Sequence, residues 1–313
     1  MTQTSASQPS AAPSLETAGQ AIERRLLAAG LDPDYVRLVA VMTVEEDLDG
    51  GIDATSAATV PDEARCTADF TARKAGVVAG LPVAAAVLDA VSGGTAEVEF
   101  LVEDGARVEP GRVLMSVTGR TRDLLTAERS ALNLLSHLSG VATRTRAWVD
   151  AVAGTGAKIR DTRKTTPGLR RLEKYAVRCG GGVNHRMSLS DAAMVKDNHV
   201  VAAGGAVEAF ELVRKRFPDL PVEVEVDSLD QLLPVVAAGA ELILLDNFNP
   251  DRLRAAVLLV GRNEPYGRTL LEASGGLTLD QARAVAESGV DYLAVGELTH
   301  SAPVLDIGCD FRA

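Results

Sequence analysis

The chain has 313 residues, which is room for one large domain or two ordinary ones. Hydrophobic residues make up 46% of it and aromatic residues only 4%, so the core must be built from Ala, Val and Leu. The formal net charge of −11 disfavours a nucleic-acid-binding protein, and no apolar run approaches the roughly 20 residues needed to span a bilayer.

The start of the sequence lacks the features of a signal peptide. Residues 1–14 carry no charged side chain and no long apolar stretch, and their Ser, Ala and Pro content predicts a disordered tail. The three cysteines, Cys66, Cys179 and Cys309, are scattered, which argues against a disulfide framework or a zinc site. A cytoplasmic enzyme is the simplest class that fits.

The first third of the chain predicts a small domain of helices and strands. Residues 15–35 have leucines on one helical face, which predicts a helix. Residues 96–100 and 113–117 alternate in polarity and predict strands, and Gly-containing turn signals lie between them.

A further helix is expected over about 122–138, where apolar residues recur at helical spacing. Arg129, Asn133 and His137 are four residues apart and share its polar stripe. On spacing alone, a solvated helix face is the simplest interpretation of this stripe.

From about residue 155, short apolar runs alternate with helical segments, and each run finishes on a polar or Gly-rich element. Strand, loop and helix in repetition predict parallel strands with helical crossovers, either as a barrel or as an open sheet. The G-x-G-x-x-G fingerprint of dinucleotide-binding sheets is missing, whereas barrels carry catalytic groups at strand ends. The six runs are 157–160, 193–195, 222–226, 242–245, 270–271 and 292–295.

Basic residues are concentrated in residues 158–199. This stretch holds ten Lys and Arg against four acids, a local charge of +6 within a chain of −11. Such a reversal predicts an anionic ligand. Within the stretch, Arg170, Arg171, Lys174 and Arg178 are interpreted as surface charge.

The remaining cations follow predicted strands or glycine-rich bends and are better candidates for binding. Strand-end cations need a partner, and Arg grips carboxylates or phosphates in bidentate fashion. The candidates are Arg163, Lys164, Arg186 and Lys196, with His185 beside Arg186.

Two acids and a glycine-rich turn complete the predicted site. Glu225 and Asp246 lie near the ends of consecutive strands, where they could hold Mg²⁺ or stabilise a developing positive charge; ordinary ion pairing is the alternative. Residues 274–276 (Ser-Gly-Gly) follow the next strand and precede a helix, a place where backbone amides bind phosphate. These features indicate an enzyme site for a polyanion, and a lyase or aldolase acting on a phosphorylated sugar would fit them nearly as well.

Several motifs, in order, resemble the quinolinate phosphoribosyltransferase family from about residue 25 to the end. They are 128–133 (ERSALN), 139–143 (SGVAT), 161–170 (DTRKTTPGLR), 174–177 (KYAV), 180–186 (GGGVNHR), 196–199 (KDNH), 223–225 (EVE), 246–247 (DN), 274–276 (SGG) and 296–301 (GELTHS). The resemblance implies an α/β fold with an N-terminal α/β sandwich domain, residues 15–138, and an incomplete seven-stranded α/β barrel, residues 139–297. Residues 298–313 are expected to pack back on the first domain.

The resemblance also implies a reaction: quinolinate and phosphoribosyl pyrophosphate give nicotinate mononucleotide, pyrophosphate and CO₂, with Mg²⁺, in NAD biosynthesis. It implies a homodimer in which Arg129 reaches the partner's active site. Residues expected to bind quinolinate are Arg129, Arg163, His185, Arg186 and Lys196. Those expected to bind phosphoribosyl pyrophosphate are Lys164, Asn198, Ser274, Gly275, Gly276, Gly296 and His300. Lys164, Glu225 and Asp246 are expected to be catalytic, and the two acids to hold the metal.

Three alternatives stay open on the sequence. A paralogue of the same fold could use another acceptor, and a nicotinate transferase would lack the decarboxylation. A non-catalytic anion-binding protein is the alternative from another class, although it would gain nothing from carboxylates in its binding site.

Overall fold

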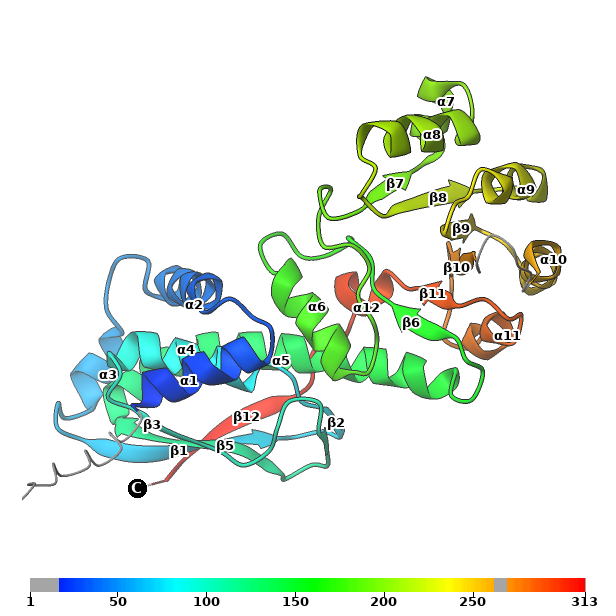
Figure 1. The fold of residues 1–313 in the computed structure, drawn as a ribbon. Coiled ribbons are helices and arrows are strands. Elements are labelled where there is room, and N and C mark those ends of the chain that lie inside the picture. The colour runs from blue at the N-terminus through cyan, green and yellow to red at the C-terminus, as the bar shows by residue number, and fades with distance from the viewer. Residues whose placement is uncertain (1–16, 262–268, 313) are drawn as a thin grey trace, which may run out of the picture.

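The computed structural model describes residues 17–261 and 269–312, so the predicted tail 1–14 lies outside the described residues. The N-terminal part is built on an antiparallel sheet, and Figure 1 shows α1, α2, α4 and α5 over one face of it. Its strands, in spatial order, are β12 (Ile307–Arg312), β1 (Arg65–Ala72), β5 (Val113–Arg120) and β3 (Glu97–Phe100), and β2 (Gly76–Val77) pairs separately with β4 (Arg107–Val108). Its helices are α1 (Ala18–Ala28), α2 (Pro33–Leu48), α3 (Ala54–Thr59), α4 (Leu81–Ser92) and α5 (Thr121–Ala151).

The first helix is shorter than predicted. One helix was expected over 15–35, but α1 ends at Ala28 and α2 begins at Pro33. Gly30 between them adopts a φ of +69°, a left-handed conformation that ends helices. Pro33 has no N–H to donate, so it fits the first turn of a new helix.

The longest helix, α5, contacts both parts of the molecule (Figure 1). It was expected to end near residue 138 but continues to Ala151, with buried side chains such as Trp148 on its continuation. Gly140 stands within it because the chain crosses there: a Cβ on Gly140 would lie 2.9 Å from the Cα of Val304. The expected division between residues 138 and 139 thus falls within a helix, and the domain boundary stays a prediction.

The C-terminal part is an incomplete α/β barrel, and every pair of neighbouring strands in its sheet is parallel. All six predicted runs form strands of this sheet. Where seven strands were expected, the seventh position is an isolated parallel bridge between Val183 and Arg160 of β6. In spatial order the strands are β6 (Lys158–Arg160), β11 (Tyr292–Ala294), β10 (Leu270–Ser274), β9 (Leu242–Asp246), β8 (Val222–Val226) and β7 (Ala193–Val195).

Helices follow these strands and the chain then returns to the first sheet, where β12 pairs antiparallel with β1 from Ile307 to Arg312. Because the barrel strands are parallel, their carboxyl ends share one side of the molecule. No described helix is long and apolar enough to cross a membrane. The helices of this part are α6 (Arg170–Cys179), α7 (Asp197–Ala203), α8 (Ala206–Arg216), α9 (Leu229–Ala237), α10 (Pro250–Val260), α11 (Ala282–Ala286) and α12 (Glu297–His300).

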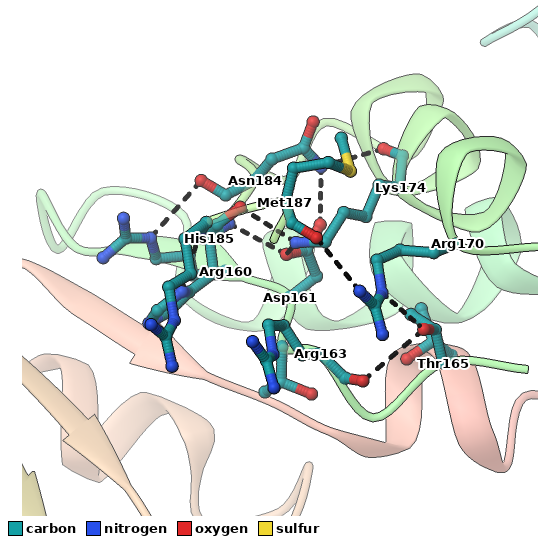
Figure 2. A network of polar contacts seen from close by, with 12 residues as sticks. Arg160, Asp161, Arg163, Thr165, Arg170, Lys174, Asn184, His185 and Met187 are labelled. Atoms are coloured by element: carbon teal, nitrogen blue, oxygen red, sulfur yellow. Dashed lines mark hydrogen bonds and ion pairs between the residues drawn. The ribbon is translucent and has the colours of Figure 1, made fainter. Parts of the chain in front are cut away.

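A buried ion pair ties β6 and α6 to the segment 183–187. The side chains of Lys174 and Asp161 are both fully buried and in contact with each other. Figure 2 shows Lys174, Asn184 and His185 converging on Asp161. Asp161 Oδ1 accepts the backbone N–H of His185 at 2.8 Å, Lys174 Nζ donates to the His185 carbonyl at 2.9 Å, and Asn184 Nδ2 donates to Asp161 Oδ2.

The interpretation of Lys174 as surface charge is therefore wrong. Its position on α6 faces Asp161, which lies 13 residues earlier at the end of β6, and no helical pattern reveals such a partner. Burial raises the pKa of Asp161 and lowers the pKa of Lys174, whereas each charge favours the ionised form of the other. The pair is satisfied only because hydrogen bonds surround it.

Removing one member of this pair should strongly destabilise the protein. Lys174→Met leaves the buried carboxylate of Asp161 without its cation, and we expect a loss of about 3–5 kcal/mol in the free energy of unfolding. Arg171→Met, on the same helix, removes an exposed partner of Asp32 and should cost less than about 1 kcal/mol. Urea denaturation of both variants measures the difference. Similar losses in the two would show that the buried pair has no special weight.

Candidate active site

A cavity of about 400 Å³ lies at the carboxyl ends of the parallel strands. It is lined by most of the residues that the sequence proposed: Arg163, Lys164, His185, Arg186, Lys196, Glu225, Asp246, Ser274 and Gly275. It is also lined by residues to which the sequence analysis gave no role: Thr162, Met194, Leu244, Glu272 and Ala294. Five proposed residues do not line it: Arg129, Asn198, Gly276, Gly296 and His300.

The cations of the cavity are incompletely neutralised by the protein. Arg186 donates through Nη1 to the Ala192 carbonyl at 2.9 Å, but its buried Nε has no partner among the described residues. Burial lowers the pKa of Arg186, and the nearby charge of Arg163 lowers it further. Lys196 Nζ lies 3.1 Å from Oε2 of Glu225. Two guanidinium groups that repel each other at a cavity wall favour an anionic ligand between them.

The loop after β6, which carries Arg163 and Lys164, is held by residues of α2, α6 and α12. Thr299 Oγ1 donates to the Lys164 carbonyl at 2.8 Å. The backbone N–H of Thr166 donates to Oε2 of buried Glu173 at 3.0 Å. At the far end of the loop, Tyr35 of α2 donates its hydroxyl to the Gly168 carbonyl at 2.6 Å.

These contacts fix the backbone from which the two cations project. Glu173 is itself held, because His137 Nε2 lies 2.8 Å from its Oε1. His137 belongs to the polar stripe of α5 that the sequence first suggested to be solvated. Its side chain instead contacts the buried Glu173 of α6. No sequence motif connects Tyr35, Glu173 and Thr299, which come from distant segments.

The two proposed acids lie at the ends of neighbouring strands, Glu225 on β8 and Asp246 on β9. Burial raises the pKa of Asp246, while the charges of Lys196 and Lys164 and a 2.7 Å hydrogen bond from Asn247 Nδ2 act in the opposite direction. Both carboxylates border the same cavity. Such hard oxygen donors suit a divalent cation such as Mg²⁺.

His185 lies at the floor of the cavity, but protein groups occupy both of its ring nitrogens. Nδ1 accepts the backbone N–H of Arg186 at 2.7 Å, and Nε2 lies 2.7 Å from Oε2 of Glu223. Because Nδ1 is an acceptor here, Nε2 carries the ring proton and donates a hydrogen bond to Glu223. His185 is then neutral with no free donor. These contacts argue against direct binding of a carboxylate by His185, which stays a prediction. They favour a role for His185 in positioning Arg186, whose backbone N–H it accepts.

The glycine-rich turn after β10 brings its backbone close to the neighbouring strand end. Gly275 has a φ of +91°, and a Cβ there would lie 2.9 Å from the backbone N of Asn247, so only glycine fits. Ser274 and Gly275 line the cavity, whereas Gly276 is exposed beside it.

The remaining proposed residues lie around or away from this cavity. A Cβ on Gly296 would be 3.0 Å from Cδ of Lys164 and 3.1 Å from Nε2 of His300, so these three residues lie together at the next strand end. Asn198 is exposed in the first turn of α7. Arg129 is exposed on α5 and takes no part in the cavity of its own chain.

Comparison with known proteins covers most of the chain. The family model described as quinolinate phosphoribosyl transferase, N-terminal domain, matches residues 53–139, and that of the C-terminal domain matches residues 141–310. The nicotinate-nucleotide pyrophosphorylase (carboxylating) of Mycobacterium leprae is 55% identical over 278 residues, which cover 88% of this chain and 97% of that protein. The human protein of the same name is 37% identical over 283 residues, covering 90% and 93%.

Solved structures agree with the fold. The crystal structure of NadC from Streptococcus pyogenes matches with a TM-score of 0.84 at 37% identity, covering 90% of this chain and 99% of that chain. The nicotinate-nucleotide pyrophosphorylase from Francisella tularensis matches with a TM-score of 0.83 at 34% identity, covering 89% and 96%. With both domain models matched in order and the strand-end cavity in place, the chain belongs to the quinolinate phosphoribosyl transferase family.

Proposed function

We propose that this protein transfers the phosphoribosyl group of phosphoribosyl pyrophosphate to quinolinate, with decarboxylation, giving nicotinate mononucleotide, pyrophosphate and CO₂ for NAD biosynthesis. The observation that carries the proposal is the single cavity in which Arg163, Lys164, Arg186 and Lys196 face Glu225 and Asp246. Its cations suit two anionic substrates, and its acids suit a cationic transition state. The names of the relatives from Mycobacterium leprae and human describe this activity.

The acceptor end of the cavity is formed by Arg163, Arg186 and Lys196. Quinolinate carries two adjacent carboxylates, and a guanidinium binds a carboxylate through two parallel hydrogen bonds. The unpartnered Nε of Arg186 is a donor that such a ligand would satisfy. His185 and Glu223 would keep Arg186 in place beneath the ligand.

The phosphate end of the cavity is formed by the later strand ends. Lys164, Gly296 and His300 lie together there, and the turn 274–276 offers backbone amides on the adjacent strand. Asn198 would complete this end from α7. Lys164 would then balance the charge that builds up on the leaving pyrophosphate.

Glu225 and Asp246 would hold Mg²⁺, because they are oxygen donors on neighbouring strands and border the same cavity as the cations. When bound, Mg²⁺ supplies positive charge to the pyrophosphate oxygens. The carboxylates themselves would face the ribose carbon, which becomes positively charged as the pyrophosphate departs, and would stabilise that charge electrostatically. The ring nitrogen of quinolinate then attacks this carbon. The positive charge that the nitrogen acquires draws in the electrons released when the adjacent carboxylate leaves.

A homodimer would complete the site. Arg129 does not line the cavity of its own chain. Beside it, α2 packs against α5, where Ser130 Oγ donates a hydrogen bond to the Thr43 carbonyl, and α2 exposes large apolar side chains. Leu38 and Met42 on this helix are 58% and 62% exposed. A second copy covering this face would bury apolar area and receive Arg129 in its cavity. A cytoplasmic location is also proposed, since the three cysteines are all free thiols.

The first test of the proposed function identifies the product. Purified protein is incubated with quinolinate, nicotinate or nicotinamide, each with phosphoribosyl pyrophosphate, with Mg²⁺ or with excess chelator. We expect nicotinate mononucleotide from quinolinate with Mg²⁺, far slower turnover of nicotinate, and loss of activity with chelator. Comparable turnover of nicotinate would contradict the decarboxylating assignment, and no turnover of any acceptor would favour a paralogous enzyme or an anion-binding protein.

The second test concerns the shared site and uses two single variants, Arg129→Ala and Lys196→Ala. Each removes a cation that contacts a desolvated carboxylate, a loss of roughly 2–5 kcal/mol, so each homodimer should be nearly inactive. In a mixed dimer one site receives both intact residues and the other neither. Co-expression should restore activity to about half of wild type per mixed dimer, or about one quarter in a random mixture.

A mixture as inactive as its components, despite proven subunit exchange, would show that Arg129 does not act across the dimer. As a control, Arg171→Ala mixed with Lys196→Ala should behave as a simple average, because Arg171 is on the surface and pairs with Asp32 of its own chain.

A further inference from the structure

At the floor of the cavity lies a cluster of four ionisable side chains to which the proposed mechanism gives no part in proton transfer. Arg160 of β6 places Nη1 2.6 Å from Oε2 of Glu272 on β10. His185 Nε2 lies 2.7 Å from Oε2 of Glu223 on β8 and 3.6 Å from Oε1 of Glu272. The Glu272 side chain is fully buried yet borders the cavity. Of the two carboxyl groups in the cluster, it is the one that borders the cavity.

The cluster has one cation too few for two ionised carboxylates. Arg160 is its one permanent charge, because His185 donates from Nε2 in a neutral tautomer. Oε1 of Glu272 and Oε1 of Glu223 are both buried without a hydrogen-bond partner among the described residues. An ionised carboxylate would leave such an oxygen unsatisfied, whereas a protonated carboxyl carries its own donor. One proton on this pair removes the imbalance.

The electrostatics assign that proton to Glu272. The pKa of Glu272 is raised to about 8, with burial as the largest cause and the charge of Glu223 as the next. Arg160 acts against both, and Asp161 adds to the raising effect. Tyr292 of the neighbouring strand β11 also contacts this cluster: the Arg160 guanidinium lies over its ring, with Cζ 4.8 Å from the ring centroid. Glu272 therefore holds a proton near neutral pH at the border of the cavity.

A metal ion is the other occupant that this cluster suggests, since His185, Glu223 and Glu272 lie close enough to share one. The hydrogen bonds argue against it. With Nδ1 accepting the backbone N–H of Arg186, Nε2 must keep its proton and cannot offer a lone pair. Arg160, bonded to Glu272, would also stand beside the metal as a like charge.

The decarboxylation that we propose creates a need for such a proton. When the carboxylate on C2 of the pyridinium ring leaves as CO₂, the electron pair of the broken C–C bond stays on C2. A proton must then bond to that pair to give the C2–H of nicotinate mononucleotide. Of the cations at the acceptor end, Arg163 and Arg186 cannot supply it, because a guanidinium does not deprotonate in proteins, and the Lys196 ammonium is engaged by Glu225 at 3.1 Å.

We propose that Glu272 is the catalytic acid that protonates C2 after CO₂ leaves; this inference rests on the proposed function. The O–H bond of Glu272 breaks, its proton bonds to C2, and Glu272 is left as a carboxylate paired with Arg160. Water entering the open cavity returns the proton before the next turnover. The proton donor, Glu272, and the carboxylates that would stabilise the transition state, Glu225 and Asp246, are thus separate groups at different depths in the barrel.

The test compares Glu272→Gln with wild type and with Glu272→Asp, which keeps an acid on a shorter stem. Glu272→Gln should lower kcat by about 10²–10⁴-fold, the usual contribution of a general acid, while the Kd of quinolinate, measured by calorimetry, changes by less than about tenfold. The kcat of Glu272→Asp should lie between those of wild type and Glu272→Gln. In D₂O the solvent isotope effect on kcat should grow in Glu272→Gln, because proton delivery from water becomes limiting.

The pH profile separates a catalytic from a structural role. In wild type the carboxyl loses its proton as pH rises through about 8, so kcat should fall on the alkaline side with that midpoint. Glu272→Gln should lose this alkaline limb. Glu223→Gln, which removes the neighbouring negative charge, should lower the pKa of Glu272 and move the limb to lower pH.

The outcomes distinguish this inference from the function on which it rests. If wild type makes no nicotinate mononucleotide, the proposed function and the inference both fail. If wild type is active but Glu272→Gln keeps its kcat within about threefold, or keeps the alkaline limb, the function stands and the inference is overturned. Loss of quinolinate binding in step with activity, in both Glu272 variants, would mean that Glu272 only supports the cavity floor.

Discussion

The site depends on the buried contact between Asp161 and Lys174. Two fully buried charges are tolerated only when they are paired and hydrogen-bonded, and here the partners are the backbone N–H and carbonyl of His185. The contact therefore fixes a chain segment rather than merely two side chains. Arg163 follows Asp161 by two residues and Arg186 follows His185 by one, so a single contact sets the spacing of the two guanidinium groups in the cavity.

With those backbones fixed, the protein can hold cations together without neutralising them. Arg186 and Arg163 repel each other, and the acids that act on Arg186 are bound elsewhere: Glu223 to His185, and Asp191 to the backbone N–H groups of Met187 and Ser188. That arrangement costs stability in the free protein, and an anionic ligand relieves the cost. The clamp on the loop by Tyr35, Glu173 and Thr299 serves the same end, because a mobile loop would let the charges separate.

The sequence predicted the barrel strands because each run is short, apolar and closed by a polar residue, so Lys196 and Asp246 could be placed at strand ends in advance. It could not predict that Lys174 is buried, since an amphipathic helix reveals a face but not the acid opposite it. It placed Glu272 at a strand end but gave it no role, because the shortage of cations around it appears only when β6, β8 and β10 are brought together. The extension of α5 past residue 138 was missed because Gly140 resembles a stop signal until the crossing chain at Val304 is seen.

Depth in the barrel explains how one fold can use carboxyl groups in opposite states. Glu225 and Asp246 lie beside cations: Lys196 Nζ is 3.1 Å from Oε2 of Glu225, and the charges of Lys196 and Lys164 act against the raising effect of burial on the pKa of Asp246. Glu272 lies deeper, shares one guanidinium with Glu223, and is held in the protonated form by burial. Environments that push the pKa values of carboxyl groups apart allow one of them to act as an acid while others stabilise positive charge. The same β10 strand carries both levels: Glu272 is buried and Ser274, two residues later on the same face of the strand, is partly exposed, so the two-residue period of a strand places both side chains in one cavity at different depths.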